Sequence, residues 1–211
     1  MVHAIRTSQV EDSQVFRYRI MELEDRYRKQ ALGMACTLVS LVNLRDSYTV
    51  AHSGRVATYA RATALRIGLN EKEIDTLVMA ALLHDIGKIG VADHVLLKQG
   101  KLTDLEFAQI NKHPELGWIA LKNLDDFKQA SLIVLHHHER LDGAGYPGHL
   151  TGNEIPLGSR IISVADSYDA LTTDRPYRSA RTREQAVDEL LRGAGTHFDA
   201  RVLNGFLDSL D

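Results

Sequence analysis

The chain has 211 residues, 44% of them hydrophobic, which is enough for one substantial core, so we expect one domain plus an extension. A formal net charge of −3 gives no reason to expect a nucleic-acid polymer or a membrane as partner, so affinity for an anion must come from local cations or bound metal. The single cysteine, Cys36, excludes an intrachain disulfide, and its thiol is expected to be buried. Because the sequence shows no leader pattern and no long apolar run, we expect a cytoplasmic protein.

The first part of the chain indicates long helices, because the first of only four prolines is Pro114 and alternating strand patterns are essentially missing. The predicted fold class is all-α. One helix is expected from about Val15 to Leu44, with an approximate heptad stripe formed by Phe16, Ile20, Leu23, Tyr27, Met34 and Leu41. Two interpretations stay open: the helix packs on the chain's own core, or it is a dimerising or signal-transmitting stem. We divide the chain into an extension, 1–44, and a domain, 45–211.

The next two helices lead to the first group of polar side chains. One runs from about Ser47 or Thr49 to Ile67 and is ended by Gly68. Asn70 can cap the following helix, with Glu73 placed to complete a capping box. That helix has a core-facing apolar stripe, and His84 and Asp85 lie at its end.

The rest of the chain is expected to be helical apart from a turn-rich loop over 141–157, whose length suggests a functional role. Capping boxes are predicted at Thr103 with Glu106 and at Thr182 with Gln185, and Asp199 is expected to cap the last helix. The expected helices are those beginning at Thr103 and at His113-Pro114, then 126–138, 159–173, and those beginning at Thr182 and at Asp199.

Two adjacent pairs, His84-Asp85 and His137-His138, have side chains that suit a metal cluster near a helix end. The alternative for the first pair is capping of neighbouring turns, and for the second a surface histidine run. Asp166 lies three residues before Asp169 on an otherwise apolar helix. Burying such carboxylates costs several kcal/mol unless they are paired or metal-bound, so a ligand role for Asp166 is credible.

Two further histidines, His52 and His113, stand alone, and a lone histidine is usually structural or exposed. They become candidate metal ligands because the other proposed ligands need further donor groups to complete a metal site. A mixed set of imidazoles and carboxylates suits Fe, Mn, Zn, Co or Ni and does not choose among them.

Taken together, these motifs occur in an order that resembles the HD-GYP family, the branch of the HD phosphohydrolases that degrades cyclic di-GMP. The resemblance covers roughly residues 45–207. It is carried by His84-Asp85-Ile86-Gly87-Lys88, His113-Pro114-Glu115-Leu116-Gly117, His137-His138-Glu139, Asp142-Gly143-Ala144-Gly145-Tyr146-Pro147, Val164-Ala165-Asp166, Asp169-Ala170-Leu171-Thr172 and Arg175-Pro176-Tyr177-Arg178.

The resemblance implies a helical bundle of the HD-domain type with additional C-terminal helices, after the long N-terminal helix. It also implies a centre of two divalent metal ions, with Fe or Mn favoured over Ni, Co or Zn. Some family members hold a third ion through a glutamate four residues before the early histidine; Tyr48 stands there, so we expect two ions. The implied ligands, with Asp85 bridging, are His52, His84, Asp85, His113, His137, His138 and Asp166.

The expected reaction is hydrolysis of cyclic di-GMP to pGpG, GMP or both by a hydroxide that two metal ions activate. Lys88 would neutralise charge on the phosphate or the leaving group. The resemblance suggests that Asp169 orients the attacking water; a surface carboxylate paired with Arg175 or Arg178 is the alternative.

For the substrate, Arg175 and Arg178 are candidates to bind the second phosphate, with surface salt bridging as the alternative. Tyr146 is expected at the substrate, and in the family the Gly-Tyr-Pro segment is thought also to contact partners such as diguanylate cyclase domains. A homodimer through the N-terminal helix is a further expectation. The rival functions are hydrolysis of another cyclic or linear dinucleotide and a non-catalytic cyclic di-GMP sensor.

Overall fold

The computed structural model describes residues 2–43, 49–174 and 179–210, and within them the chain is helical without any strand, as predicted. The α-helices are α1 (Val2–Asn43), α2 (Thr49–Arg66), α3 (Glu71–Leu83), α4 (Asp93–Leu96), α5 (Asp104–Ile110), α6 (His113–Leu121), α7 (Lys128–Leu135), α8 (Leu157–Thr172), α9 (Arg183–Arg192) and α10 (Ala200–Leu207). Short 3-10 helices are η1 (Ile86–Gly90), η2 (Asp125–Phe127) and η3 (Gly152–Glu154).

The chain divides into two compact units, Met1–Thr37 and Leu38–Asp211. α1 is a single helix that begins in the first unit and ends at Asn43, and its stripe side chains, including Ile20 and Leu23, are exposed. The helix begins earlier than predicted, since no proline or glycine interrupts the polar segment before Val15. The prediction that Cys36 is buried is wrong: the thiol lies on the exposed surface of α1.

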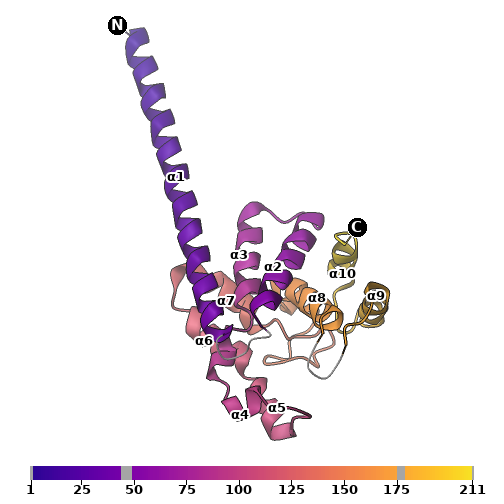
Figure 1. Cartoon of the computed structure of the whole chain (residues 1–211). Coiled ribbons are helices and arrows are strands. Elements are labelled where there is room, and N and C mark those ends of the chain that lie inside the picture. The colour runs from indigo at the N-terminus through magenta and orange to yellow at the C-terminus, as the bar shows by residue number, and fades with distance from the viewer. Residues whose placement is uncertain (1, 44–48, 175–178, 211) are drawn as a thin grey trace. The chain divides into compact units, whose positions relative to one another are not determined.

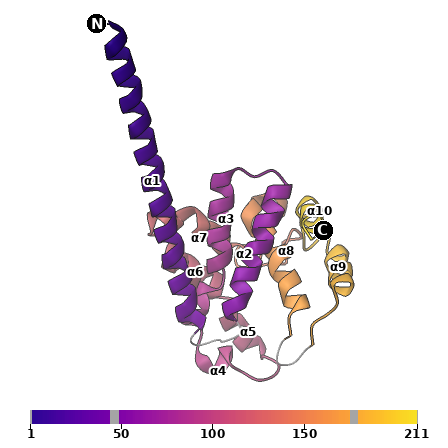
Figure 2. The ribbon, with the colours of Figure 1, turned by 45° about the horizontal axis from the view of Figure 1, so that its top comes forward.

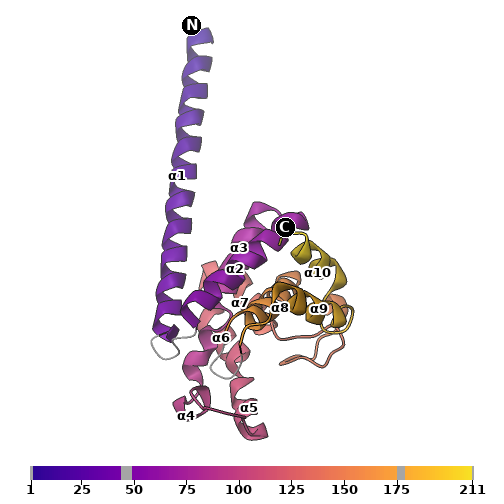
Figure 3. The same cartoon turned by 45° about the vertical axis from the view of Figure 1, so that its right-hand side comes forward.

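In the second unit, α2 and α3 pack side by side, and α2 also packs on α8 and α10 (Figures 1 and 2). Alanines with no exposed surface, such as Ala60 and Ala80, let the α2 and α3 backbones approach closely. The rings of Tyr59, Tyr168 and Phe206 meet edge to face where α2, α8 and α10 join. α4 and α5 lie together at the end of the unit away from α10 (Figure 3).

Several helix ends follow the predicted caps. Asn70 and Glu73 form a capping box at α3, as Thr103 with Glu106 does at α5 and Thr182 with Gln185 at α9. Asp199 caps α10 through the amides of Arg201 and Val202. Gly68, with φ +84°, follows the end of α2.

One predicted helix is too long. The helix expected over 126–138 consists of η2 and α7, and α7 ends at Leu135. His137 and His138 therefore lie in the turn after α7. The His137 imidazole binds the carbonyl oxygen of Val134, an acceptor that a continuing helix would give to a backbone amide. The described helices include none with the length and apolar character that crossing a bilayer requires.

Candidate metal centre

Side chains from five segments converge at one end of the α2–α3 pair. α2 contributes His52, the end of α3 contributes His84 and Asp85, and α6 begins at His113. The turn after α7 contributes His137 and His138, and α8 contributes Asp166. Two groups of three could each hold a metal ion, with donor atoms within 4.8 Å of one another: His113, His137 and His138 form one, and His52, His84 and Asp85 the other.

Backbone carbonyls orient three of these histidines in the same way. The Nδ1 atoms of His84, His113 and His137 lie 2.7, 2.8 and 2.6 Å from the carbonyl oxygens of the residues three positions earlier. A carbonyl can only accept a hydrogen bond, so each Nδ1 must carry the proton. The Nε2 atom of each ring is left with a lone pair directed into the centre, as metal-binding histidines require.

The Nε2 atoms need a positive partner. Those of His113 and His137 are 3.2 Å apart, and two lone pairs cannot form a hydrogen bond with each other. The Nε2 atom of His84 is buried and has no hydrogen-bond partner among the described residues. Buried acceptors without partners are destabilising, and a shared cation would satisfy them. The donor set therefore fits divalent metal.

Asp85 lies between the two groups. Its Oδ1 is 3.5 Å from His113 Nε2, while its Oδ2 is 3.4 Å from His84 Nε2 and 4.0 Å from His52 Nε2. One carboxylate oxygen thus faces each group, the geometry that a bridging ligand needs. Lys88, from η1, places its Nζ 2.6 Å from the same Oδ2.

His52 connects the centre to a second layer of charge. Its Nε2 is 3.2 Å from Asp166 Oδ1, and its Nδ1 donates to Asp169 Oδ2 at 2.7 Å. Asp169 also accepts two hydrogen bonds from Arg55, through Nε at 2.5 Å and Nη2 at 2.9 Å. Asp169 is buried, not a surface carboxylate, and it supports His52 from behind.

The pKa values fit this assignment of charge. Burial lowers the pKa of His113, and burial with the neighbouring imidazoles lowers that of His137 well below its usual value and that of His138 to about 3. These rings are therefore neutral near pH 7, the form that binds metal. Burial opposes ionisation of Asp85, but Lys88 and the histidines hold its pKa well below the usual range.

The pKa of the histidine in the other wall of the centre shifts in the opposite direction. Burial lowers the pKa of His52, but its hydrogen bonds to Asp166 and Asp169 outweigh this effect and raise the value to about 9. Burial opposes ionisation of Asp166 also, yet the hydrogen bond to His52 and the nearby imidazoles lower its pKa. Both carboxylates that face the donor atoms are thus ionised.

Gly87 allows the two halves of the centre to approach. A Cβ at this position would overlap the His113 carbonyl oxygen and the Gly117 amide nitrogen. η1 and α6 therefore pack backbone to backbone, which brings Asp85 and His113 together. The site therefore requires a glycine at position 87, because any larger residue would push η1 and α6 apart.

A buried carboxylate that the sequence interpretation gave no role holds the glycine-rich loop. Glu139 accepts hydrogen bonds from the amides of Gly148 and Leu150, at 2.6 and 3.1 Å. The loop returns along the histidine turn, where the Tyr146 amide donates to the His138 carbonyl. The Tyr146 and His138 rings lie 5.0 Å apart, so the loop places its tyrosine beside the metal-binding candidates.

Two residues behind the first layer, Arg55 and Glu139, were missed by the sequence interpretation. Arg55 lies three positions after His52 on α2, and that spacing is the signal that could have found it. Glu139 directly follows the histidine pair, but its partners are about ten residues away, in a loop whose path the sequence does not predict. The predicted substrate contacts Arg175 and Arg178, and Tyr48, lie outside the described residues.

The comparisons with known proteins agree with this geometry. The family model described as "HD domain" matches residues 37–202. The response regulator RpfG of Xanthomonas campestris, a cyclic di-GMP phosphodiesterase, is 40% identical over 88% of this chain and 49% of its own length. A 3′3′-cGAMP-specific phosphodiesterase of Vibrio cholerae is 37% identical over 87% of this chain and 36% of its own. The chain spans about half or less of these relatives.

Solved structures show the same fold. An HDG"Y"P protein from Bdellovibrio bacteriovorus matches with a TM-score of 0.64 at 20% identity, over 87% of this chain and 64% of that one. The cyclic GMP-AMP-specific phosphodiesterase V-cGAP3 of V. cholerae matches with a TM-score of 0.55 at 32% identity, over 85% and 41%. The family match, the relatives and the His-Asp centre agree: this chain belongs to the HD domain family, in its HD-GYP branch.

Proposed function

We propose that this chain hydrolyses a 3′–5′ phosphodiester bond of a cyclic dinucleotide, with cyclic di-GMP as the first candidate substrate. The observation that supports this most is the convergence of buried Nε2 lone pairs on the Asp85 carboxylate. Such a donor set is costly to bury without cations. An HD-type centre with two cations is suited to an anionic phosphodiester.

The donor groups suggest how two ions would be shared. His113, His137 and His138 would hold one ion, and His52, His84 and Asp166 the other, with Asp85 giving one oxygen to each. Fe or Mn is the first expectation, and Ni, Co or Zn would also accept these ligands. When bound, such a pair polarises the phosphate and lowers the pKa of a coordinated water from 15.7 toward about 7.

Lys88 would act on the charge that develops in the reaction. Its ammonium is partly exposed and already pairs with Asp85, so it lies at the edge of the centre. With metal sharing the Asp85 charge, Lys88 can stabilise the phosphate or the departing 3′ oxygen. A preorganised group of this kind contributes about 2–4 kcal/mol to the transition state.

Asp169 would position His52, a role different from the water-orienting one that the family resemblance suggests. Its oxygens already accept from His52 and Arg55, which leaves little capacity for a water. Asp169 fixes the His52 ring so that Nε2 faces Asp85 and Asp166. This carboxylate–histidine pair is a common outer layer of metal sites.

Tyr146 would bind the substrate from the loop. Burial raises the pKa of its phenol, and the charges of Asp166 and Asp85 raise it further. The phenol therefore keeps its proton at neutral pH and can donate to a phosphate oxygen. Arg175 and Arg178 stay predictions for the second phosphate.

The choice of substrate rests on the relatives. Several are named cyclic di-GMP phosphodiesterases, and others are named 3′3′-cGAMP-specific phosphodiesterases at similar identity. The second candidate is therefore 3′3′-cGAMP. We expect linear pGpG, GMP or both from cyclic di-GMP. A homodimer through α1 and a contact with a diguanylate cyclase domain are further proposals.

The deciding experiment is anaerobic incubation of Fe- or Mn-loaded protein with cyclic di-GMP and, separately, 3′3′-cGAMP, with products separated by chromatography. We expect linear product from the wild type and a loss of roughly 100-fold or more in Asp85→Ala. His94→Ala, a change outside the centre, is the matched control. Unchanged substrates, with metal bound and the fold intact, would refute the enzyme proposal and favour the sensor alternative.

A further inference from the structure

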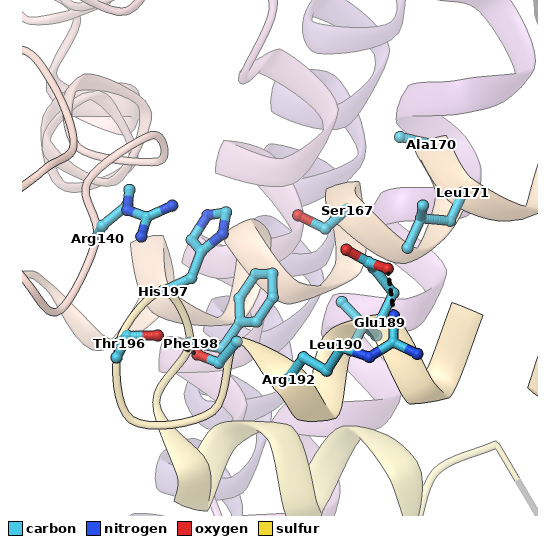
Figure 4. Close-up of a pocket in the computed structure, with 11 residues that line it drawn as sticks. Arg140, Ser167, Ala170, Leu171, Glu189, Leu190, Arg192, Thr196, His197 and Phe198 are labelled. Atoms are coloured by element: carbon cyan, nitrogen blue, oxygen red, sulfur yellow. Dashed lines mark hydrogen bonds and ion pairs between the residues drawn. The ribbon is translucent and has the colours of Figure 1, made fainter. Parts of the chain in front are cut away.

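A pocket of about 490 Å³ lies beside α8, which contributes Ser167, Ala170 and Leu171 to its lining. Its walls come from three places: α8, the end of α9 with the turn before α10, and Arg140 at the start of the glycine-rich loop. Figure 4 shows Arg140 and His197 on one side of this pocket and Glu189 and Arg192 on the other, with Ser167 between them. Its size is that of a small-ligand site.

The polar groups in this pocket retain bonding capacity. Glu189 accepts from Arg181 and Arg192 through the same oxygen, Oε2, so within the described residues its Oε1 has no partner. Arg140 donates hydrogen bonds to Asp142 through Nε and Nη2, which leaves its Nη1 group to donate to a ligand. Convergent groups with capacity left, around an apolar floor, are the pattern of a recognition site.

One wall is flat and aromatic. The His197 ring stacks on the ring of Phe198, with centroids 4.1 Å apart and planes at 11°. Phe198 is buried beneath, while His197 is half-buried and lines the pocket. This fixed ring pair gives a planar ligand such as a nucleobase a rigid aromatic surface to pack against.

The Glu189 carboxylate selects among bases. Because Oε2 already accepts from Arg181 and Arg192, the open Oε1 is the acceptor for a base, and it favours an edge that presents N–H donors. Guanine presents two, N1–H and the N2 amino group, whereas adenine presents a ring acceptor beside its amino group. Arg192, next to Glu189, can donate to a guanine acceptor, and Arg140, across the pocket, can bind a phosphate.

We propose that this pocket is a second ligand site, separate from the metal centre, that binds a guanine 5′-mononucleotide. The guanine edge pairs with Glu189, the base packs against the His197–Phe198 ring pair, and the phosphate binds Arg140. The inference rests on this pocket alone and does not require the proposed hydrolysis. GMP, if the centre produces it, has the chemistry that this pocket recognises.

The site would sense or influence the metal centre through α8. Ser167 and Ala170 line the pocket, and they directly follow Asp166 and Asp169 in the sequence. Successive residues on a helix point about 100° apart, so one helix presents carboxylates to His52 and a wall to the pocket. None of the candidate metal ligands lines the pocket.

The test is calorimetric titration of the full metal-loaded chain with GMP, AMP and guanosine. We expect GMP to bind about tenfold or more tightly than either AMP or guanosine. Glu189→Gln puts an amide donor against the guanine donors, so it should remove the preference for GMP over AMP. Asp188→Asn, on the same helix and outside the pocket, should keep that preference. Arg140→Ala should bring GMP affinity down to that of guanosine.

Two results would overturn the proposal. Equal affinity for GMP and AMP in the wild type would remove the assigned role of Glu189. GMP binding that survives Glu189→Gln but disappears in Asp85→Ala would place the nucleotide at the metal centre instead. Hydrolysis of cyclic dinucleotides is measured separately, so a failure of the enzyme proposal is distinguishable from a failure of this one.

Discussion

The Nε2 atoms of His113 and His137 lie 3.2 Å apart, although both rings use Nδ1 to bind a backbone carbonyl. Each Nε2 therefore carries a lone pair, and the rings are held in an arrangement that only a shared positive partner relieves. The turns that hold them, before α6 and after α7, come from separate parts of the chain. The backbone thus preorganises the donors before any ion binds.

Removing one of these donors should release metal. His137→Ala is expected to weaken metal binding by more than the 10–100-fold typical of losing an outer-layer partner, because a direct ligand is lost. Metal content per chain, measured by mass spectrometry after dialysis, should fall. His94→Ala, on α4, is the control and should keep its metal. Full metal content in His137→Ala would exclude His137 as a ligand.

Asp169→Ala separates two roles for this carboxylate. If Asp169 positions His52, the change should weaken metal affinity by roughly 10–100-fold, with loss of activity following from loss of metal. If Asp169 only orients water, metal affinity should be unchanged while kcat falls. Metal titration of Asp169→Ala beside Asp188→Ala, an exposed carboxylate on α9, distinguishes them.

Local sequence patterns predicted the elements well, but contacts between distant segments had to come from the structure. Asn70 with Glu73 is a cap readable within four residues, and it forms as expected. The end of α7 was predicted three residues too late, because the His137 side chain competes for a helix carbonyl. The spacing of Arg55 from His52 places both on one helix face, but the partner of the Arg55 guanidinium, Asp169, lies 114 residues away, and no local pattern identifies it.

Glu139→Gln should loosen the glycine-rich loop without unfolding the domain. Glutamine has one acceptor oxygen and an amino group, so it cannot accept from both Gly148 and Leu150, and its amino group would face one of those amides. Amide hydrogen exchange at these two residues should speed up, and KM should rise because Tyr146 loses its fixed position. Glu115→Gln, exposed on α6, is the control; unchanged exchange at Gly148 would contradict this role.

Gly87→Ala and Gly54→Ala should have opposite effects on stability. A Cβ at Gly87 would overlap the α6 backbone, so we expect a loss of about 1–3 kcal/mol and displacement of Asp85 from His113. A Cβ at Gly54, within α2, meets nothing within 4 Å, so alanine should stabilise the helix by about 0.5–1 kcal/mol. Thermal unfolding of both variants measures the difference, and equal midpoints would contradict the packing argument.

The α1 stripe should mediate self-association of the chain. Ile20 and Leu23 are exposed on the stripe, and glutamates at both positions would place charge in a two-helix seam. We expect the wild type to sediment as a dimer and the double variant Ile20→Glu, Leu23→Glu as a monomer. Tyr18→Glu, exposed on α1 but off the stripe, should leave the dimer intact.

Charge pairing gives the same interface a stricter test. In a parallel dimer that places Ile20 at position a, Arg19 of one helix meets Glu24 of the other, so Arg19→Glu should weaken the dimer. Adding Glu24→Arg reverses the pair and should restore association. A wild type that stays monomeric at every concentration would remove α1 as the interface. Failure of the charge swap to restore a weakened dimer would exclude this parallel register.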